Sequence, residues 1–167
     1  MKSEYKMTTL QDTQRLAEQL AKKLQGGDVI GLIGNLGAGK TTFVQFLAHT
    51  LGIKQTVNSP TFNIIKVYAI KNHKSKIKNL IHIDAYRLHS AAELQALGVE
   101  EYFVDPHVVT VIEWADRVKK ILPKDAMMIK IKLKKNGERI FSATSTALSQ
   151  PRAFFPLPQS SHGTCLQ

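Results

Sequence analysis

Residues 34–41, Gly-Asn-Leu-Gly-Ala-Gly-Lys-Thr, combine three glycines with a lysine and a hydroxyl group. Glycines let successive backbone N–H groups converge on one anion, and a lysine adds a positive charge beside them. The pattern fits G-x-x-x-x-G-K-[ST] at every fixed position. In that pattern the lysine, here Lys40, reaches the β and γ phosphates, and the hydroxyl of Thr41 is an oxygen ligand for Mg²⁺. The sequence therefore predicts a site for a polyphosphate with magnesium.

The segments on either side are those that a phosphate-binding loop requires. Val29–Ile33 is a short apolar run typical of a buried parallel strand, and apolar residues recur at helical spacing after Lys40. A helix that begins near Lys40 would point the positive end of its dipole at the phosphates. An unused glycine-rich turn is the alternative, but it has no need of the lysine and hydroxyl. The predicted nucleotide contacts come from Asn35, Leu36, Gly37, Ala38, Gly39, Lys40, Thr41 and Thr42.

Two carboxylates each follow an apolar, β-rich run. Asp84 follows residues 80–83, and Glu113 follows residues 108–112. Ligands of open α/β sheets bind beyond the carboxyl ends of the strands, so both acids are candidates to hold a metal or to orient water. A turn aspartate is the alternative for Asp84. His82 is interpreted as an ordinary strand residue and not as a ligand.

The length of 167 residues suits one domain. Thr8 or Thr9 can cap a first helix, and β-hairpins are expected within residues 62–83 and around Asn136-Gly137. Residues 99–104 are expected to link two elements, and Lys130, Lys132 and Lys134 to form the solvent face of an edge strand. The predicted fold is α/β, a P-loop NTPase-like three-layer fold with a mixed, mainly parallel sheet. Its domain spans residues 1–143, and residues 144–167 form a Pro/Ser/Thr-rich tail that is expected to be flexible.

The chain is strongly basic, with a formal net charge of +10 and a pI near 9.8. Such a charge attracts polyanions or an acidic partner, although a merely solvated basic surface fits equally well. No apolar run approaches 18 residues, so no membrane association and a cytoplasmic location are expected. The single cysteine, Cys165, can form no internal disulfide.

Five short motifs in series resemble the bacterial TsaE (YjeE) family over about residues 8–142. They are Gly27-Asp28, residues 34–42, Ser-Pro-Thr-Phe at 59–62, Asp-Ala-Tyr-Arg-Leu at 84–88, and Glu113-Trp114. The resemblance implies an ATPase that acts with the partner proteins TsaB and TsaD in the threonylcarbamoyl modification of adenosine 37 of tRNA. The tRNA would then be an indirect partner, and ATP and Mg²⁺ the cofactors.

The same resemblance assigns roles to residues outside the phosphate loop. Thr61 matches a threonine of a switch-like loop, and Asp84 and Glu113 match the two site acids. We favour Glu113 near the metal and Asp84 near the attacking water, although sequence leaves the reverse open. Arg87 could neutralise charge that develops on the phosphoryl group, or could form a surface ion pair. Trp114 could line the nucleotide or partner surface, or could be an ordinary half-buried tryptophan.

Two other functions remain open at this stage. The first is a small-molecule kinase, and this hypothesis is weakened because the five arginines are scattered and do not form a lid. A nucleotide-gated protein-binding module, in which turnover is incidental, shares the same loop. GTP specificity is unsupported because the chain contains no Asn-Lys-x-Asp element.

Overall fold

The computed structural model describes residues 2–72 and 75–145. This part of the chain forms seven strands, four α-helices and one 3₁₀ helix. In chain order they are β1 (Lys2–Met7), α1 (Leu10–Ala21), β2 (Val29–Ile33), α2 (Lys40–Thr50), β3 (Ile65–Ala69), β4 (Asn79–Asp84), α3 (Ala91–Gln95), α4 (Glu100–Val104), β5 (Val108–Glu113), η1 (Ala115–Ile121), β6 (Met127–Leu133) and β7 (Arg139–Ser145).

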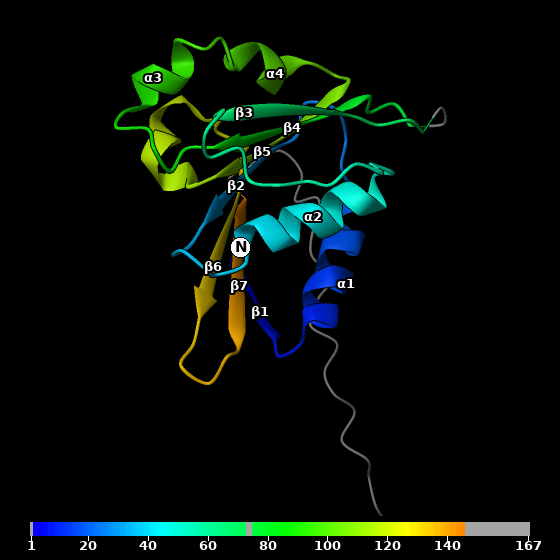
Figure 1. The fold of residues 1–167 in the computed structure, drawn as a ribbon, viewed down its shortest axis with the longest axis vertical. Coiled ribbons are helices and arrows are strands. Elements are labelled where there is room, and N and C mark those ends of the chain that lie inside the picture. Colours follow the sequence, from blue (N-terminus) through cyan, green and yellow to red (C-terminus); the bar gives the residue numbers. More distant parts are fainter. Residues whose placement is uncertain (1, 73–74, 146–167) are drawn as a thin grey trace, which may run out of the picture.

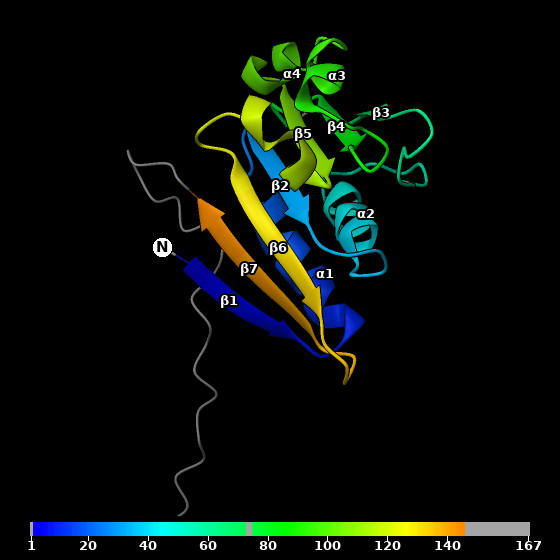
Figure 2. The ribbon, with the colours of Figure 1, turned by 90° about the vertical axis from the view of Figure 1, so that its left-hand side faces the viewer.

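All seven strands belong to one sheet, in the order β1-β7-β6-β2-β5-β4-β3. Strands β6, β2, β5 and β4 are parallel to one another, whereas β7 and β3 run in the opposite direction. β1 is antiparallel to β7 and therefore runs with the other four. Figures 1 and 2 show this single twisted sheet from two sides. The predicted mixed α/β fold is confirmed, with five of seven strands in one direction.

Helices cover the two faces of the sheet unequally. α1 and α2 pack against each other and against one face, in a core that contains Leu20, Ile30 and Phe43. α3, α4 and η1 cover the opposite face around β4 and β5, in a second core. Figure 2 shows β6, β7 and β1 without a helix on the viewer's side. The helices thus form two layers around the sheet, and the second layer covers only half of it.

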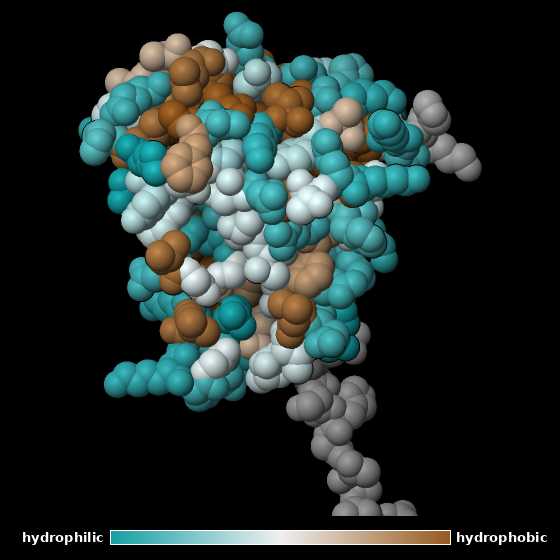
Figure 3. Space-filling view, in the orientation of Figure 1, coloured by the Kyte–Doolittle hydropathy of each residue, from teal (hydrophilic) through white to brown (hydrophobic). Residues whose placement is uncertain are grey.

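The two short helices of that second layer bury one side and expose the other. Leu94 and Phe103 lie in the core, whereas Leu97, just after α3, and Val104, at the end of α4, are exposed. Figure 3 shows hydrophobic side chains gathered over α3 and α4 at the top of the view. On the rest of that face, hydrophilic residues separate the apolar ones, as is common on protein surfaces.

Local signals explain where several elements begin and end. The Thr9 side chain accepts a hydrogen bond from Asp12 N at 3.1 Å, and Asp12 accepts one from Thr9 N at 2.9 Å, so α1 begins with the predicted threonine cap. At the start of α3, Ser90 N donates to Glu93 at 3.0 Å. α2 ends where Gly52 adopts a positive φ of 91°. The hairpin of β6 and β7 turns at Asn136-Gly137, as predicted.

One strand was not predicted, and two expectations about secondary structure were wrong. Residues 2–7, to which the sequence analysis assigned no element, form β1, which pairs with β7 and buries Tyr5 and Met7. Residues 100–104 form helix α4 and are not merely a link, because Phe103 docks in the second core. β6, with exposed lysines at 130 and 132 and Lys134 directly after its end, is not an edge strand, because β2 and β7 flank it; the edges are β1 and β3.

The C-terminal boundary also differs from the expectation. β7 continues to Ser145, two residues beyond the predicted domain limit, because it pairs with β6 along its whole length. Residues 146–167, which hold the rest of the predicted tail, lie outside the described residues. Across residues 2–72 and 75–145, no helix has the length and apolar character needed to cross a membrane.

Candidate functional site

The loop between β2 and α2 curves around the side chain of its own lysine. Gly37 and Gly39 have φ values of 77° and 103°, which other residues rarely adopt, and α2 begins at Lys40. Lys40 is 5% exposed, and its Nζ donates to the carbonyl oxygens of Gly34 at 2.7 Å and Asn35 at 3.1 Å. The glycines thus give the loop the shape that the sequence motif predicts, with the ammonium group inside it.

The electrostatic setting of Lys40 combines burial with nearby acids. Burial lowers the pKa of Lys40 from its ordinary value, and the negative charges of Glu113, Asp84 and Asp116 oppose this shift. The Nζ atom also lies 3.9 Å from the centre of the Trp114 ring, where a cation is attracted to the π electrons. Acids and the indole ring therefore surround the ammonium group.

The loop also packs tightly against the neighbouring hairpin. A Cβ atom at Gly34 would lie 2.6 Å from the carbonyl oxygen of Ile131 in β6, so only glycine fits there. Arg139, the first residue of β7, donates from Nε to the carbonyl oxygen of Ala38 at 3.1 Å. Sequence reasoning missed Arg139, because it lies 101 residues from Ala38 and no motif marks it. The structure thus adds a second cation to the loop.

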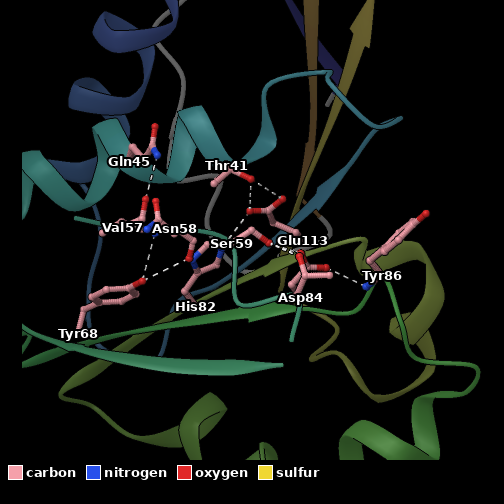
Figure 4. A network of polar contacts seen from close by, with 11 residues as sticks. Thr41, Gln45, Val57, Asn58, Ser59, Tyr68, His82, Asp84, Tyr86 and Glu113 are labelled. Carbon is pink, nitrogen blue, oxygen red and sulfur yellow. Dashed lines mark hydrogen bonds and ion pairs between the residues drawn. The ribbon is translucent and has the colours of Figure 1, made fainter. Parts of the chain in front are cut away.

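Strand register brings the two predicted acids together. Asp84 at the end of β4 is the partner of Glu113 at the end of β5 in the parallel ladder, and both side chains are nearly buried at 3% and 2% exposure. Figure 4 shows both carboxylates near the start of α2. The carboxyl ends of these strands therefore gather the acids at the phosphate loop, as expected for an open α/β sheet.

Glu113 contacts the hydroxyl that follows the loop lysine. Thr41 Oγ1 donates to Glu113, with distances of 2.9 Å to Oε1 and 3.1 Å to Oε2 (Figure 4). No corresponding hydrogen bond joins Thr41 to Asp84 within the part of the chain that the structure describes. The two acids are thus distinguished by their partners, and only Glu113 is joined to the predicted magnesium ligand.

Asp84 is held by the segment that contains Thr61. Its Oδ2 accepts from the hydroxyl of Ser59 and, at 2.8 Å, from that of Thr61, while its Oδ1 accepts from Tyr86 N at 2.8 Å. Ser59 was part of the quoted Ser-Pro-Thr-Phe motif, but sequence reasoning gave it no role. These bonds tie the loop before β3 to the end of β4, so that a movement of the loop would be felt at Asp84.

His82 is a residue that sequence reasoning set aside. It is fully buried at 0% exposure, and its Nε2 lies 2.9 Å from Oε1 of Glu113. It shares β4 with Asp84 and points to the same side of the strand, because the two residues are two apart. The spacing His-x-Asp at a strand end was the signal that could have identified it.

The remaining predicted residues border this centre. Arg87 is exposed, and its guanidinium lies 4.3 Å from the ring centre of Phe62; within the described residues, no hydrogen bond or ion pair joins it to either acid. Trp114 is half-buried and stacks at a tilt on Tyr86, with ring centres 4.9 Å apart. Of the predicted loop contacts, Asn35 and Leu36 are exposed and Thr42 is half-buried. The structure therefore assembles the lysine, Thr41 and both acids, and leaves Arg87 outside.

Backbone strain is concentrated beside the two acids. Trp114, directly after Glu113, has a φ of 58°, and Ile64, whose carbonyl oxygen accepts from Asp84 N at 2.9 Å, has a φ of 63°. Such conformations cost energy for bulky and β-branched residues, and they persist where the surroundings enforce them, often at functional sites.

A metal ion would find few protein ligands at this centre. Within residues 2–72 and 75–145, no group of three or more His, Cys, Asp or Glu side chains could hold a metal ion. Magnesium in nucleotide sites commonly takes only one or two protein oxygens, and phosphate oxygens and water supply the rest. Thr41 and Glu113 offer that kind of oxygen donor set.

Comparison with known proteins agrees with this arrangement. The family model described as "Threonylcarbamoyl adenosine biosynthesis protein TsaE" matches residues 7–141. A protein of Bacillus subtilis (strain 168) named tRNA threonylcarbamoyladenosine biosynthesis protein TsaE is 39% identical, over 81% of this chain and 80% of its own length. The protein of the same name from Treponema pallidum is 37% identical, over 77% of this chain and 90% of its own.

A solved structure is similar as well. The crystal structure of YdiB from Bacillus subtilis superposes with a TM-score of 0.70 at 32% identity, and covers 87% of this chain and 86% of the other. The family match spans the phosphate loop and both site acids. This chain therefore belongs to the TsaE family.

Proposed function

We propose that this chain is a magnesium-dependent ATPase that acts in the cytoplasm, with TsaB and TsaD, in the threonylcarbamoyl modification of adenosine 37 of tRNA. The ATPase part rests chiefly on the hydrogen bond between Thr41 and Glu113 at the phosphate loop. The pathway rests on family membership and on the names of the relatives, and the two partner proteins rest on the family resemblance.

The loop suits a polyphosphate. Its glycines carry no Cβ atom that would keep an anion away from the backbone N–H groups. Nothing lies within 4 Å of the position that a Cβ at Gly37 would take. Lys40 now donates to two loop carbonyl oxygens, which are weaker acceptors than a phosphate oxygen. The ammonium group would therefore exchange these contacts for the β and γ phosphates of ATP.

Thr41 and Glu113 would hold the metal. The hydroxyl oxygen of Thr41 and the carboxylate of Glu113 are 2.9 Å apart and are hard oxygen donors, which Mg²⁺ prefers. When bound, Mg²⁺ neutralises negative charge on the phosphates. Because Glu113 is joined to Thr41 and Asp84 is not, this assignment agrees with the expectation that Glu113 is the acid nearer the metal.

Asp84 would then orient the attacking water. Its two oxygens accept three hydrogen bonds from Ser59, Thr61 and Tyr86 N, which fix the carboxylate beside the loop. A fixed acceptor can hold a water molecule in line with the bond that breaks, so the water oxygen bonds to the γ phosphorus as ADP leaves. Positioning and charge account for the proposed catalysis, and no covalent intermediate with the protein is needed.

Arg87 would complete the site only after a movement. Its guanidinium now lies on Phe62, which is 83% exposed. A cation–π contact at an exposed site is worth about 0.5–1 kcal/mol, so it does not hold Arg87 firmly. A shift of the loop before β3 could release the side chain toward the phosphates.

One observation favours a second function, a nucleotide-gated binding module. Leu36, in the phosphate loop, is 82% exposed, and Phe62, beside Thr61, is similarly exposed. Both loops border the nucleotide site, and large apolar side chains in such positions suit contact with a partner protein. In this alternative, ATP would set the loop conformation that the partner recognises, and turnover would be incidental.

Phosphate release by the purified protein tests the proposal. The parent protein should release phosphate slowly from ATP with Mg²⁺, Lys40→Ala should release none, and TsaB with TsaD should stimulate the parent. Phosphate release without any acceptor would count against a small-molecule kinase. Turnover by Lys40→Ala at the parent rate would refute the nucleotide site, and binding of TsaB and TsaD without stimulation would favour the gated module.

A further inference from the structure

His82 is buried in the sheet, where a polar ring destabilises the fold unless it forms hydrogen bonds. It lies on β4 opposite Val111 of β5, two residues before the Asp84–Glu113 pair, so that its side chain is on the same face of the sheet as theirs. Its side chain has no exposure, yet its ring reaches the Glu113 carboxylate. Burial of a polar group without a hydrogen bond costs about 1–3 kcal/mol, so an apolar side chain would fill this position at a lower cost than histidine.

Among the residues that the structure describes, only one of its ring nitrogens has a hydrogen-bond partner. Nε2 lies 2.9 Å from Glu113 Oε1, whereas Nδ1 is buried and has no hydrogen-bond partner in the described part of the chain. An ionised carboxylate can only accept hydrogen bonds, so Nε2 must carry the proton and donate it. The nearest aromatic contact, the Tyr68 ring, lies 6.5 Å away between centres and offers packing only.

Glu113 is thus held from two sides. Thr41, at the start of α2, donates from the side of the phosphate loop, and His82 donates from within the sheet. Figure 4 shows the Glu113 carboxylate between Thr41 and the His82 ring. Thr41 lies in the first turn of α2, directly after the loop whose lysine would exchange its contacts for phosphates, whereas His82 belongs to a strand paired on both sides. Of the two partners, His82 is the fixed one.

We infer that His82 is a positioning residue: its Nε2–H group fixes the Glu113 carboxylate in the orientation that faces Thr41. This inference rests on the proposed function, in which Thr41 and Glu113 hold magnesium. His82 touches neither nucleotide nor metal in this scheme and acts only through Glu113. Without it, the carboxylate could rotate about its side-chain bonds, and magnesium would no longer strengthen nucleotide binding as much.

Two conservative variants separate the contact from general burial of a polar group. In His82→Gln the side-chain amide can occupy the place of Nε2, whereas in His82→Asn the amide takes the place of Nδ1 and cannot reach Glu113. His82→Gln should keep kcat for ATP within about threefold of the parent. His82→Asn should lower kcat at least tenfold, while ATP binding without Mg²⁺ changes less than about twofold.

Calorimetry of ADP binding with and without Mg²⁺ gives a readout other than turnover. Magnesium should tighten binding by the same factor in the parent and in His82→Gln, and by a smaller factor in His82→Asn. Equal loss in both variants, or no loss in His82→Asn, would overturn the inference. If the parent itself turns over no more ATP than Lys40→Ala, the proposed ATPase fails, and the magnesium factors still decide the role of His82.

If the variants do not fold, the inference can be tested on the parent protein. Nitrogen-15 NMR of the histidine rings should show the proton of His82 on Nε2, and Glu113→Gln should shift that signal more than any other histidine signal. A proton found on Nδ1 alone would contradict the inference, because Nε2 could then not donate to Glu113.

Discussion

Replacement of Thr41 by valine tests the contact at the centre of the site, because valine has the shape of threonine without the hydroxyl. Thr41 Oγ1 donates to both oxygens of Glu113, at 2.9 and 3.1 Å, and Glu113 is almost fully buried. A hydrogen bond to a charged group contributes about 1.5–3 kcal/mol. Thr41→Val should therefore lower the free energy of unfolding by about that amount, since, among the described residues, Glu113 then keeps only His82 as a side-chain donor.

The expected change is large enough to measure in two ways. In a domain of this size, each kcal/mol shifts the melting temperature by about 2–4 °C, so Thr41→Val should melt about 3–12 °C below the parent. It should also lose most of the strengthening of ATP binding by Mg²⁺, which calorimetry with and without the metal would detect. Binding of ATP without Mg²⁺ should change little, because Lys40 and the loop backbone remain.

Thr41→Ser is the matched control. Serine keeps the hydroxyl and loses only a methyl group, so it should retain most of the stability and of the magnesium dependence. If Thr41→Val melts at the same temperature as Thr41→Ser and still binds ATP more tightly with Mg²⁺, then the hydroxyl contributes neither to stability nor to magnesium binding, and Glu113 is not the acid near the metal.

Further tests address other parts of the molecule. Asp84→Asn should bind ATP like the parent but lose at least about 100-fold in turnover, as expected for a group that acts in the transition state, and parent-like turnover would assign this acid to the fold. Arg87→Ala should lower kcat more than it changes ATP affinity, and Arg87→Lys should restore only part of the loss; no change in kcat would place Arg87 on the surface alone. Gly26→Ala should melt several degrees lower, since its Cβ would lie 1.6 Å from the carbonyl oxygen of Pro106, and an unchanged melting curve would contradict this packing. The cap of α1 should weaken in acid: hydrogen bonds from Thr9 lower the pKa of Asp12, so its contribution is complete above the unfolded value of about 4 and is lost as pH falls further, and Asp12→Ala should abolish that part of the acid dependence.

Much of the local structure could be predicted because it depends on near neighbours. Residues 29–50 are a strand, a glycine loop and a helix in the order predicted, and Lys40 is the first residue of the helix. The threonine cap of α1 and the turn at Asn136-Gly137 also follow from a few adjacent residues. The motifs in series were enough to indicate the family, and the family match confirms it.

Local pattern failed where distant pairing decided the structure. β1 has a polar sequence of only six residues and becomes a strand because β7 lies beside it. The lysines of β6 suggested an edge, but whether a strand is an edge depends on which other strands join the sheet. α4 is five residues long and is stabilised by the burial of Phe103. The helix propensities of its own residues cannot predict that burial.

The sequence by itself determined which groups the site contains: the loop, Lys40, Thr41 and the two acids at strand ends. Only the tertiary structure decided how they are paired. Glu113 meets Thr41 across 72 residues and His82 across 31, and Asp84 meets Ser59 across 25. The reason is physical, because a one-residue shift in the register of β4 against β5 would turn His82 and Asp84 to the other face of the sheet and break these contacts.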